Sequence, residues 1–272
     1  MLTMYKFTVI GNPVVHSKSP RIHAHFAEQK KLSIHYDKTE ASLNLFKETV
    51  LAFQRIGGHG ANVTIPFKEE AYLLASTLTE RASIAKAVNT LKFMPDGSIY
   101  GDNTDGVGLI KDIKVNNGFH LKNLKILFVG SGGAARGILH PILKEEPREI
   151  VIANRTKDKA DKLAEEFSAY GKISAVSIDK ISGYFDVIID CTPLSAWPLP
   201  IPYEVFSECS LVYDLKYNKR QTPILDKGNL YGAELCLDGA GMLIEQAAES
   251  FYVWTGLFPD TKNILQEIHN EK

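Results

Sequence analysis

The sequence predicts an α/β protein with two domains, and two observations carry this prediction. Short apolar runs suited to strands alternate with segments of helical periodicity along most of the 272 residues, which is typical of a parallel sheet covered by helices. One of these runs leads directly into a glycine-rich turn and a helix, the pattern of a doubly wound nucleotide-binding unit. A chain of this length ordinarily forms about two domains.

The first half of the chain reads as alternating strands and helices. Runs that favour extended backbone predict strands, and runs with apolar residues at helical spacing predict helices. The expected strands are 6–10, 34–41, 60–64 and 87–93, and the expected helices are 20–31, 43–56 and 66–76. Pro95, Asp96 and Gly97 predict a turn that pairs the strand 87–93 with residues 98–100 as a hairpin. We therefore expect a largely parallel sheet covered by helices.

The second half begins after a polar loop, 101–106, and an expected helix, 107–116. Its expected strands are 125–130, 149–153, 185–190, 211–214 and 234–236, with helices at 133–144 and 157–168 between the earlier ones. The run from Met242 to Trp254 has apolar residues at helical spacing and no strand after it. We expect this run to cross back and pack on the first domain.

The glycine-rich turn is the most specific motif of the chain. The strand 125–130 leads into Gly-x-Gly-x-x-Ala, which allows a tight turn and lets a phosphate approach the N–H groups at a helix N-terminus. The next strand ends in Asn154-Arg155-Thr156. A protein that binds a free ribose 2′-hydroxyl would carry an acidic residue at this place. An arginine there suits a 2′-phosphate, so the sequence indicates NADP rather than NAD. A redox enzyme is the leading hypothesis, and a glycine turn in an unrelated α/β fold is the alternative.

These patterns set the expected domain boundaries. Residues 1–104, completed by 239–272, are expected to form an α/β substrate-binding and catalytic domain on which the C-terminal helices pack. Residues 105–238 are expected to form a Rossmann-type, doubly wound domain that binds NADP. We expect the active site in the cleft between them, at the carboxyl ends of the strands.

The composition excludes several classes of function. A net charge of -1 with scattered basic residues gives no basis for nucleic-acid binding. No stretch approaches the ~18 apolar residues that span a membrane, and a secretion signal is not expected at the N-terminus. The cysteines, Cys191, Cys209 and Cys236, are widely spaced, which fits a reducing, cytoplasmic location. The histidines of the N-terminal part show no ligand spacing, so no metal ion is expected.

A pair of serines and a lysine are candidates for chemistry in the first half. Ser17 and Ser19 are expected to aim their hydroxyls the same way, with Ser19 as the N-cap of a helix that begins at Pro20. They could cap that helix or hold a carboxylate at its N-terminus. Lys68 is expected in the first turn of a helix, where the dipole eases loss of its proton. Its alternative is a surface lysine offset by the glutamates that follow it.

Asn89 and Asp105 stand on either side of the predicted hairpin. Both could form Asx turns, and Asp105 could instead cap the helix expected from Val107.

Taken together, these segments resemble the shikimate dehydrogenase family, in order and over nearly the whole chain. The matching segments are 11–20, 62–68, 87–90, 101–106, the glycine turn, 154–156, Tyr217 before Thr222-Pro223, and 238–246. Each segment alone would be weak, but all of them in sequence are highly specific. The resemblance implies NADPH-dependent, reversible reduction of 3-dehydroshikimate to shikimate, on the chorismate route to aromatic amino acids, by a monomer or a homodimer.

The resemblance also implies roles for individual residues. Lys68 and Asp105 correspond to the catalytic pair, in which a protonated Lys68 donates to the developing alkoxide. Whether the carboxylate or the opposing helix dipole dominates the protonation of Lys68 stays open. The implied substrate contacts are Ser17, Ser19, Thr64, Asn89, Tyr217 and Gln246. The implied cofactor contacts are Gly130, Gly132, Gly133, Ala134, Asn154, Arg155, Thr156 and Gly239.

Some positions depart from the family pattern. Asp190 stands in place of the usual asparagine, Ser195 in place of a glycine, and Lys219 in place of a proline. These changes leave the catalytic pair intact but affect the expected contacts on the nicotinamide side.

Three alternative functions differ in testable ways. A quinate/shikimate dehydrogenase that uses NAD would be expected to carry an aspartate where Arg155 stands. A non-catalytic dinucleotide-binding relative would need neither Lys68 nor Asp105. A folate-pathway methylene dehydrogenase shares a two-domain layout, but the paired serines favour a small hydroxylated acid.

Overall fold

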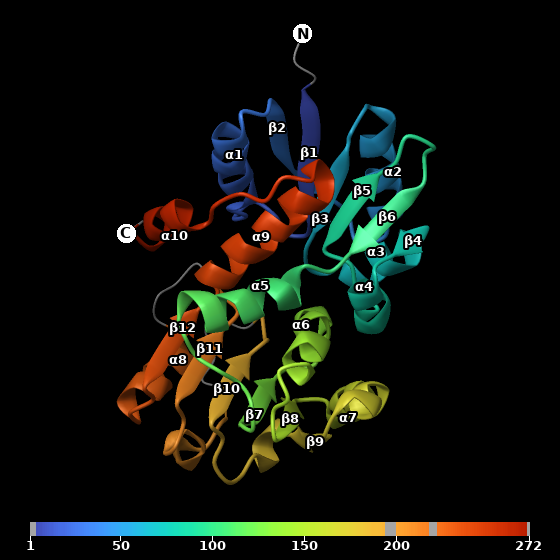
Figure 1. Cartoon of the computed structure of the whole chain (residues 1–272). Helices are drawn as coiled ribbons and strands as arrows, with labels where there is room; N and C mark the ends of the chain where they lie inside the picture. Colours follow the sequence, from blue (N-terminus) through green and yellow to red (C-terminus); the bar gives the residue numbers. More distant parts are fainter. Residues whose placement is uncertain (1–3, 194–199, 218–221, 271–272) are drawn as a thin grey trace. The chain divides into compact units, whose positions relative to one another are not determined.

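The computed structural model describes residues 4–193, 200–217 and 222–270, with the side chains of 269 and 270 left out. Within these residues the chain folds into two compact units (Figure 1). Unit 1 is Met1–Leu109 with Ile244–Lys272, and unit 2 is Ile110–Leu243. In the described ranges, no helix is long and apolar enough to cross a membrane.

The sheet of unit 1 runs in the order β2-β1-β3-β5-β6-β4. Its strands are β1 (Tyr5–Gly11), β2 (Ile34–Glu40), β3 (Gly60–Val63), β4 (Thr77–Leu78), β5 (Thr90–Phe93) and β6 (Ile99–Asp102). β1 pairs in parallel with β2 and β3, whereas β5 pairs antiparallel with β3 and β6. The predicted hairpin is β5–β6, and at its turn Asp96 Oδ1 accepts hydrogen bonds from the N–H and hydroxyl of Ser98.

Helices cover both faces of this sheet. The helices that lie wholly or largely in unit 1 are α1 (Ser19–Lys30), α2 (Phe46–Arg55), α3 (Lys68–Leu74), α4 (Glu80–Ala85), α5 (Asp105–Lys111), α9 (Ala240–Thr255) and α10 (Lys262–Asn270). Phe46 of α2 and Phe67 before α3 stack in one core cluster. On the other face α9 lies against β1 and β3 (Figure 1), where Trp254 stacks on Phe7 with ring centroids 4.3 Å apart. The predicted return of the C-terminal helix to the first unit is confirmed.

The sheet of unit 2 is parallel and runs in the order β12-β11-β10-β7-β8-β9. Its strands are β7 (Lys125–Val129), β8 (Glu149–Asn154), β9 (Ile173–Ser177), β10 (Val187–Asp190), β11 (Leu211–Asp214) and β12 (Leu235–Asp238). The chain starts at β7, builds outward to β9, then returns beside β7 and builds the other way. This is the doubly wound order of the predicted Rossmann-type fold, with its switch point between β7 and β10.

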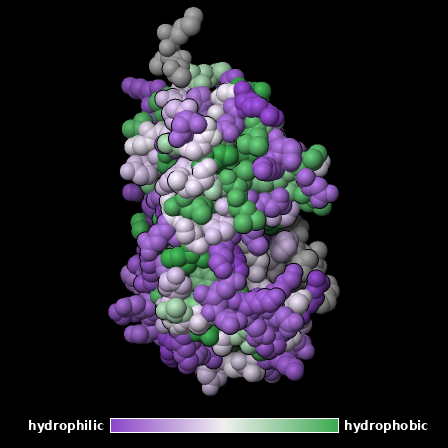
Figure 2. All heavy atoms as spheres, turned by 90° about the vertical axis from the view of Figure 1, so that its right-hand side faces the viewer, coloured by the Kyte–Doolittle hydropathy of each residue, from purple (hydrophilic) through white to green (hydrophobic). Residues whose placement is uncertain are grey.

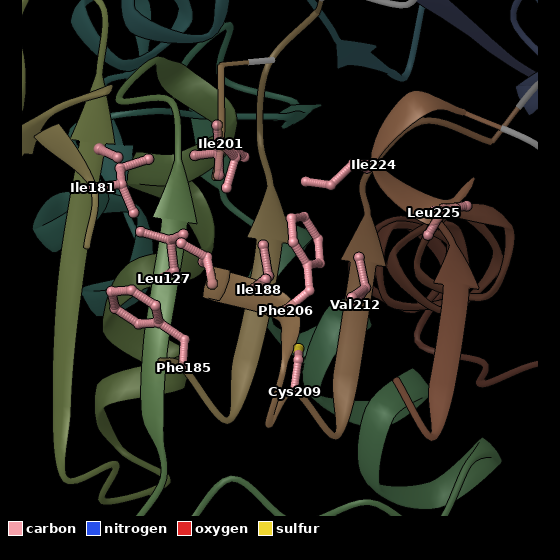
Figure 3. Packing of buried hydrophobic residues seen from close by; sticks show 13 residues of the cluster. Leu127, Ile181, Phe185, Ile188, Ile201, Phe206, Cys209, Val212, Ile224 and Leu225 are labelled. Atoms are coloured by element: carbon pink, nitrogen blue, oxygen red, sulfur yellow. The ribbon is translucent and has the colours of Figure 1, made fainter. Parts of the chain in front are cut away.

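The helices of unit 2 are α6 (Gly133–Leu143), α7 (Lys157–Phe167) and α8 (Pro223–Leu230). On one face of the sheet Leu127, Ile188 and Val212 lie side by side on neighbouring strands (Figure 3). They pack with Phe206 and Ile224, which lie over the sheet in the same buried cluster. Continuous apolar runs form these strands because both faces of the sheet are covered.

The structure differs from the expected elements at several points. The helix expected at 107–116 is α5 followed by one π-helical segment, Asp112–Asn116, where Asn116 and Asn117 donate to the Asp112 carboxylate. β9 and the short β4 were not predicted, because their side chains are largely polar or half exposed and show no apolar run.

On the face in Figure 2, hydrophobic side chains gather over unit 1, whereas hydrophilic side chains dominate unit 2.

Candidate active site

Lys68 forms a short ion pair in unit 1. It lies in the first turn of α3, as predicted, and is the first residue of that helix, which was expected to begin at Pro66; its Nζ lies 2.6 Å from Asp105 Oδ2. The two side chains are only 14% and 6% exposed. Because so little water reaches the pair, its charges interact more strongly than those of a surface pair. The alternative of a surface lysine offset by Glu69 and Glu70 is therefore wrong.

The Asp105 carboxylate is held on its second oxygen by Asn89. Asn89 Nδ2 donates to Asp105 Oδ1 over 2.8 Å, while the Asp105 N–H donates to Asn103 Oδ1. Asp105 is the first residue of α5, so its backbone is fixed by the helix as well. Each carboxylate oxygen thus has its own donor, and the carboxylate is held in one orientation.

Gln246 completes the cluster from α9. Its Oε1 lies 3.1 Å from Asn89 Nδ2, although the two residues are 157 positions apart. The Thr104 N–H donates to Asn89 Oδ1 over 2.9 Å, which fixes the orientation of the Asn89 amide. The structure therefore brings together four of the predicted site residues: Lys68, Asn89, Asp105 and Gln246.

Ser17 and Ser19 lie beside each other at the start of α1. Their hydroxyl oxygens are 3.1 Å apart, and the Ser19 N–H donates to Ser17 Oγ. The expectation that Ser19 is the N-cap is wrong: Ser19 is the first helical residue, and Lys18 precedes it with helical backbone angles. The turn that closes from Ser17 N–H to the Val14 carbonyl sets helical geometry one residue early. The two hydroxyls still come together.

Thr64 directly follows β3. Its N–H donates to the Ile10 carbonyl over 2.9 Å, which continues the pairing of β3 with β1 beyond the strand. Its side chain is half-buried. The residue therefore stands at the carboxyl ends of two parallel strands, the edge at which ligands bind in such sheets.

A buried polar network that the sequence reasoning missed crosses the interior of unit 1. Tyr36 donates to Asn62 Oδ1 over 2.7 Å, and Asn62 Nδ2 donates to the Asn89 carbonyl and to Ser250 Oγ. Burial raises the pKa of Tyr36 well above its usual range, with Ser19 opposing the shift. The network joins the element that carries the paired serines to Asn89. Its members lie on β2, β3 and α9 and just before β5, so no local spacing could reveal it.

His23, on α1, packs against Tyr36 of this network. Its ring stacks on Tyr36 with centroids 4.6 Å apart and is fully buried. Burial lowers the pKa of His23 to about 3, against a smaller effect of Asn62. His23 is therefore neutral at physiological pH and acts as a packing residue, as predicted.

The glycine turn of unit 2 leaves a helix N-terminus uncovered. Gly130 has φ +101°, a conformation that other residues adopt only with strain. Gly132 is the N-cap of α6 and carries no side-chain cap, and a Cβ there would meet nothing within 4 Å. The first N–H groups of α6, which begins with Gly133 and Ala134, have no partner within the helix. This cradle fits a phosphate.

Arg155 follows β8, the strand next to β7. It is exposed and makes no hydrogen bond or ion pair with the described part of the chain. Beside it, Asn154 Nδ2 donates to the Thr156 carbonyl, and Thr156 is the N-cap of α7. A free guanidinium one strand from an open helix N-terminus fits a dinucleotide with an additional phosphate, as in NADP(H).

The other half of the unit 2 sheet ends in buried charges. Lys216 Nζ lies 2.7 Å from Asp190 Oδ2 and 2.9 Å from Asp214 Oδ1. Burial raises the pKa of Asp190, against the effect of Lys216. Although burial opposes it, the pKa of Lys216 is raised because the two carboxylates hold the ammonium. Asp190, the departure from the family pattern, thus has a charged partner that the sequence reasoning missed.

Two further predicted residues lie near this cluster in unit 2. Tyr217 follows Lys216 and is half-buried, and burial raises the pKa of its hydroxyl. The Gly239 N–H donates to the Lys216 carbonyl, and a Cβ at Gly239 would lie 2.2 Å from the Leu215 carbonyl oxygen, so no larger residue fits. Ser195 and Lys219 lie outside the described residues.

Comparison with known proteins identifies related chains over the whole length. Family models match residues 9–91 ("Shikimate dehydrogenase substrate binding domain"), 113–197 ("Shikimate / quinate 5-dehydrogenase") and 239–269 ("Shikimate 5'-dehydrogenase C-terminal domain"). The shikimate dehydrogenase (NADP(+)) of Nitrosomonas europaea is 48% identical, with 98% of each chain covered. That of Dechloromonas aromatica is 47% identical, with 96% of each covered.

Solved structures agree with these matches. An Ael1 enzyme from Pseudomonas putida superposes with a TM-score of 0.89 and 41% identity, covering 97% of this chain and 98% of that one. Shikimate 5-dehydrogenase from Thermus thermophilus, in complex with NADP(H) and shikimate, gives a TM-score of 0.87 at 31% identity, covering 98% and 99%.

Proposed function

The chain belongs to the shikimate dehydrogenase family, and we propose that it catalyses the NADPH-dependent, reversible reduction of 3-dehydroshikimate to shikimate. This reaction lies on the chorismate route to aromatic amino acids. The observation that carries the proposal is the Lys68–Asp105 pair, 2.6 Å long and locked by Asn89. A protein that only binds a nucleotide needs no such pair.

The pair fits the reduction of a ketone. NADPH, when bound, supplies a hydride to the carbonyl carbon, and negative charge then develops on the carbonyl oxygen. Lys68 carries protons on Nζ beyond the one directed at Asp105, so it can donate to that oxygen while Asp105 holds it in place. In the reverse direction the same nitrogen accepts the hydroxyl proton.

We assign the substrate contacts mainly to residues of unit 1. The adjacent hydroxyls of Ser17 and Ser19 would hold the substrate carboxylate, with Tyr217 as a further contact. Thr64, Asn89 and Gln246 would meet the ring hydroxyls. The interlocked bonds of Asn89 and Gln246 support this assignment, because amides held in one orientation discriminate between donors and acceptors.

The cofactor contacts follow from the open groups of unit 2. Gly130, Gly132, Gly133 and Ala134 would hold the pyrophosphate, and Gly239 would lie near the nicotinamide. Arg155, with Asn154 and Thr156, would face the 2′-phosphate. A charge-assisted hydrogen bond of this kind contributes about 1.5–3 kcal/mol, which corresponds to roughly 10–150-fold preference for NADP over NAD. We further propose a cytoplasmic location and a small-molecule substrate as the partner, with the enzyme a monomer or a homodimer.

One assay tests the proposal against its alternatives. Purified protein is mixed with shikimate or quinate and with NADP or NAD, and absorbance is followed at the reduced-nicotinamide band. We expect the highest kcat/KM with shikimate and NADP. Faster turnover of quinate with NAD would indicate the quinate/shikimate enzyme instead. Cofactor binding without turnover of either acid would indicate a non-catalytic relative.

A further inference from the structure

Two neighbouring strands of unit 2 end in buried carboxylates that contact the same ammonium group. Asp190 ends β10 and Asp214 ends β11, and the two residues are paired in register. Their side chains are 2% and 0% exposed. Two like charges that lie close together and are shielded from water repel each other strongly. Lys216, whose side chain is 19% exposed, offsets this repulsion with its ammonium between them.

The hydrogen bonds show that one ammonium group, that of Lys216, is shared by two carboxylates. Asp190 Oδ1 accepts from the N–H and hydroxyl of Thr192, both neutral donors. Asp214 Oδ1 accepts from the Lys216 N–H and Nζ, whereas its buried Oδ2 has no hydrogen-bond partner within the described residues. The cluster Asp190–Lys216–Asp214 therefore carries an excess of one carboxylate.

The cluster lies in the half of the sheet that the adenosine end of a dinucleotide does not use. The glycine turn and Arg155 follow β7 and β8, on one side of the switch point, and β10 and β11 lie on the other. In doubly wound sheets a dinucleotide crosses the switch point, so its nicotinamide half meets the carboxyl ends of β10 and β11. The loop after β10 also contacts the glycine turn, since a Cβ at Gly130 would lie 3.1 Å from Thr192 Cγ2.

The two redox states of the cofactor differ in charge at the nicotinamide ring. The ring is cationic in NADP⁺ and neutral in NADPH, so a nearby fixed charge interacts differently with the two. Resting on the function proposed above, we propose that the Asp190–Lys216–Asp214 cluster sets the relative affinity of the enzyme for oxidised and reduced cofactor. Each negative charge in the cluster favours NADP⁺ over NADPH. At the separation of neighbouring groups in a partly screened site, one charge changes the ratio of the two cofactor affinities about three- to tenfold.

Dissociation constants of both cofactors test the proposal by isothermal titration calorimetry without substrate. The measured quantity is the ratio Kd(NADPH)/Kd(NADP⁺), which rises as NADP⁺ is favoured. Asp190→Asn and Asp214→Asn each remove one negative charge and should lower the ratio about three- to tenfold. Lys216→Met should raise it by a similar factor. The double variant Asp190→Asn/Lys216→Met keeps the original net charge and should return the ratio to near the wild-type value.

A matched control lies at the other end of β10. Asp186 precedes the strand and pairs with Arg148, so Asp186→Asn removes the same charge at the opposite edge of the sheet. It should leave the ratio unchanged. Asp214→Asn also separates the effect of charge from any effect on the position of Thr192. Thr192 is hydrogen-bonded to Asp190 and not to Asp214, so this variant removes a charge without removing that contact.

The outcomes distinguish this inference from the proposed function. Equal weakening of both cofactors in every variant means that the cluster is only structural, and the inference is overturned while the function stands. A shift in the control as large as in Asp190→Asn overturns it too. If the wild-type protein binds neither cofactor, the proposed function fails as well. If Lys216→Met does not fold, the two asparagine variants still decide the question.

Discussion

The candidate groups of unit 1 are side chains bonded to one another, whereas those of unit 2 are mainly backbone groups left open. In unit 1, Lys68, Asp105 and Asn89 are joined in a continuous chain of hydrogen bonds. In unit 2, the N–H groups at the start of α6 meet no capping side chain. The side chains of the first site are held in place by their hydrogen bonds to one another. In the second site, the N–H groups stay open because no side chain caps them.

The difference teaches how each unit should respond to substitution. Removing a side chain from unit 1 removes a reacting group and leaves its buried partners unsatisfied, which is costly. In the glycine turn of unit 2, adding an atom does the damage, because a phosphate needs the space. Chemistry and cofactor affinity should therefore separate between the two units.

The largest expected effect comes from Lys68→Ala. Loss of the proton donor should lower kcat by about 10²–10⁴, with the Kd of NADPH nearly unchanged. Steady-state rates and fluorescence titration of NADPH measure the two quantities. Lys47→Ala, which removes an exposed lysine of α2, is the matched control and should keep full activity. Turnover at the wild-type rate in Lys68→Ala would remove this residue from the mechanism.

Arg155→Gln should act on unit 2 alone. Without the guanidinium, kcat/KM with NADP should fall roughly 10–150-fold while that with NAD changes little. Arg148 provides the control, because it precedes β8 whereas Arg155 follows it, and it is also exposed. Arg148→Gln should leave the cofactor preference intact. An equal loss with both cofactors in Arg155→Gln would contradict a contact to the 2′-phosphate.

His23 should make the interior of unit 1 sensitive to acid. Its pKa is lowered to about 3 in the folded state, so the unfolded state binds more protons between that value and the ordinary 6.5. The stabilisation is complete above pH ~6.5 and is lost as the pH falls, by about 2 kcal/mol at pH ~5. His23→Phe should remove this part of the pH dependence of the free energy of unfolding.

Urea unfolding measures this effect through Trp254 fluorescence in a Trp197→Phe background. The exposed His120, replaced in the same way, is the control and should leave the pH dependence as it was. A slope in His23→Phe identical to that of the parent protein would show that His23 is not buried in its neutral form.

The smallest expected effect is that of a single methyl group. Gly132→Ala meets no atom of the protein, so the thermal midpoint should stay close to that of the wild type. The methyl group would occupy the approach of the pyrophosphate and weaken NADPH binding about tenfold, or ~1.4 kcal/mol. Gly130→Ala should differ, because its positive φ adds a loss of stability of about 1–2 kcal/mol. Unchanged affinity in Gly132→Ala would place the cofactor elsewhere.

The comparison of the units also explains what the sequence could predict. The strands of unit 2 other than β9 were predicted well because buried parallel strands are continuous apolar runs, and the glycine turn is a local motif. Lys68 was placed correctly in the first turn of α3 because helix starts have local signals. Ser19 was misplaced by one residue, since the deciding hydrogen bond runs from the Ser17 N–H to the Val14 carbonyl, in the turn before the helix.

The remaining site features depend on contacts between distant residues. Asn89 meets Gln246 only because α9 returns to unit 1, and Asp190 meets Lys216 only because β10 and β11 are paired in register. Nothing in the local sequence marks Lys216 as anything but a surface cation. Such pairs follow from the topology, which spacing along the chain does not encode.

The return of α9 has a consequence for the order of assembly during translation. Unit 2 is continuous, so every one of its strands has been synthesised before the ribosome reaches Ile244. Unit 1 starts first but must wait for Trp254, which covers Phe7 and bonds to the Leu91 carbonyl. Since units fold as their residues emerge, the nascent β1 strand is exposed for longest, and a premature stop codon before α9 would leave that apolar face bare.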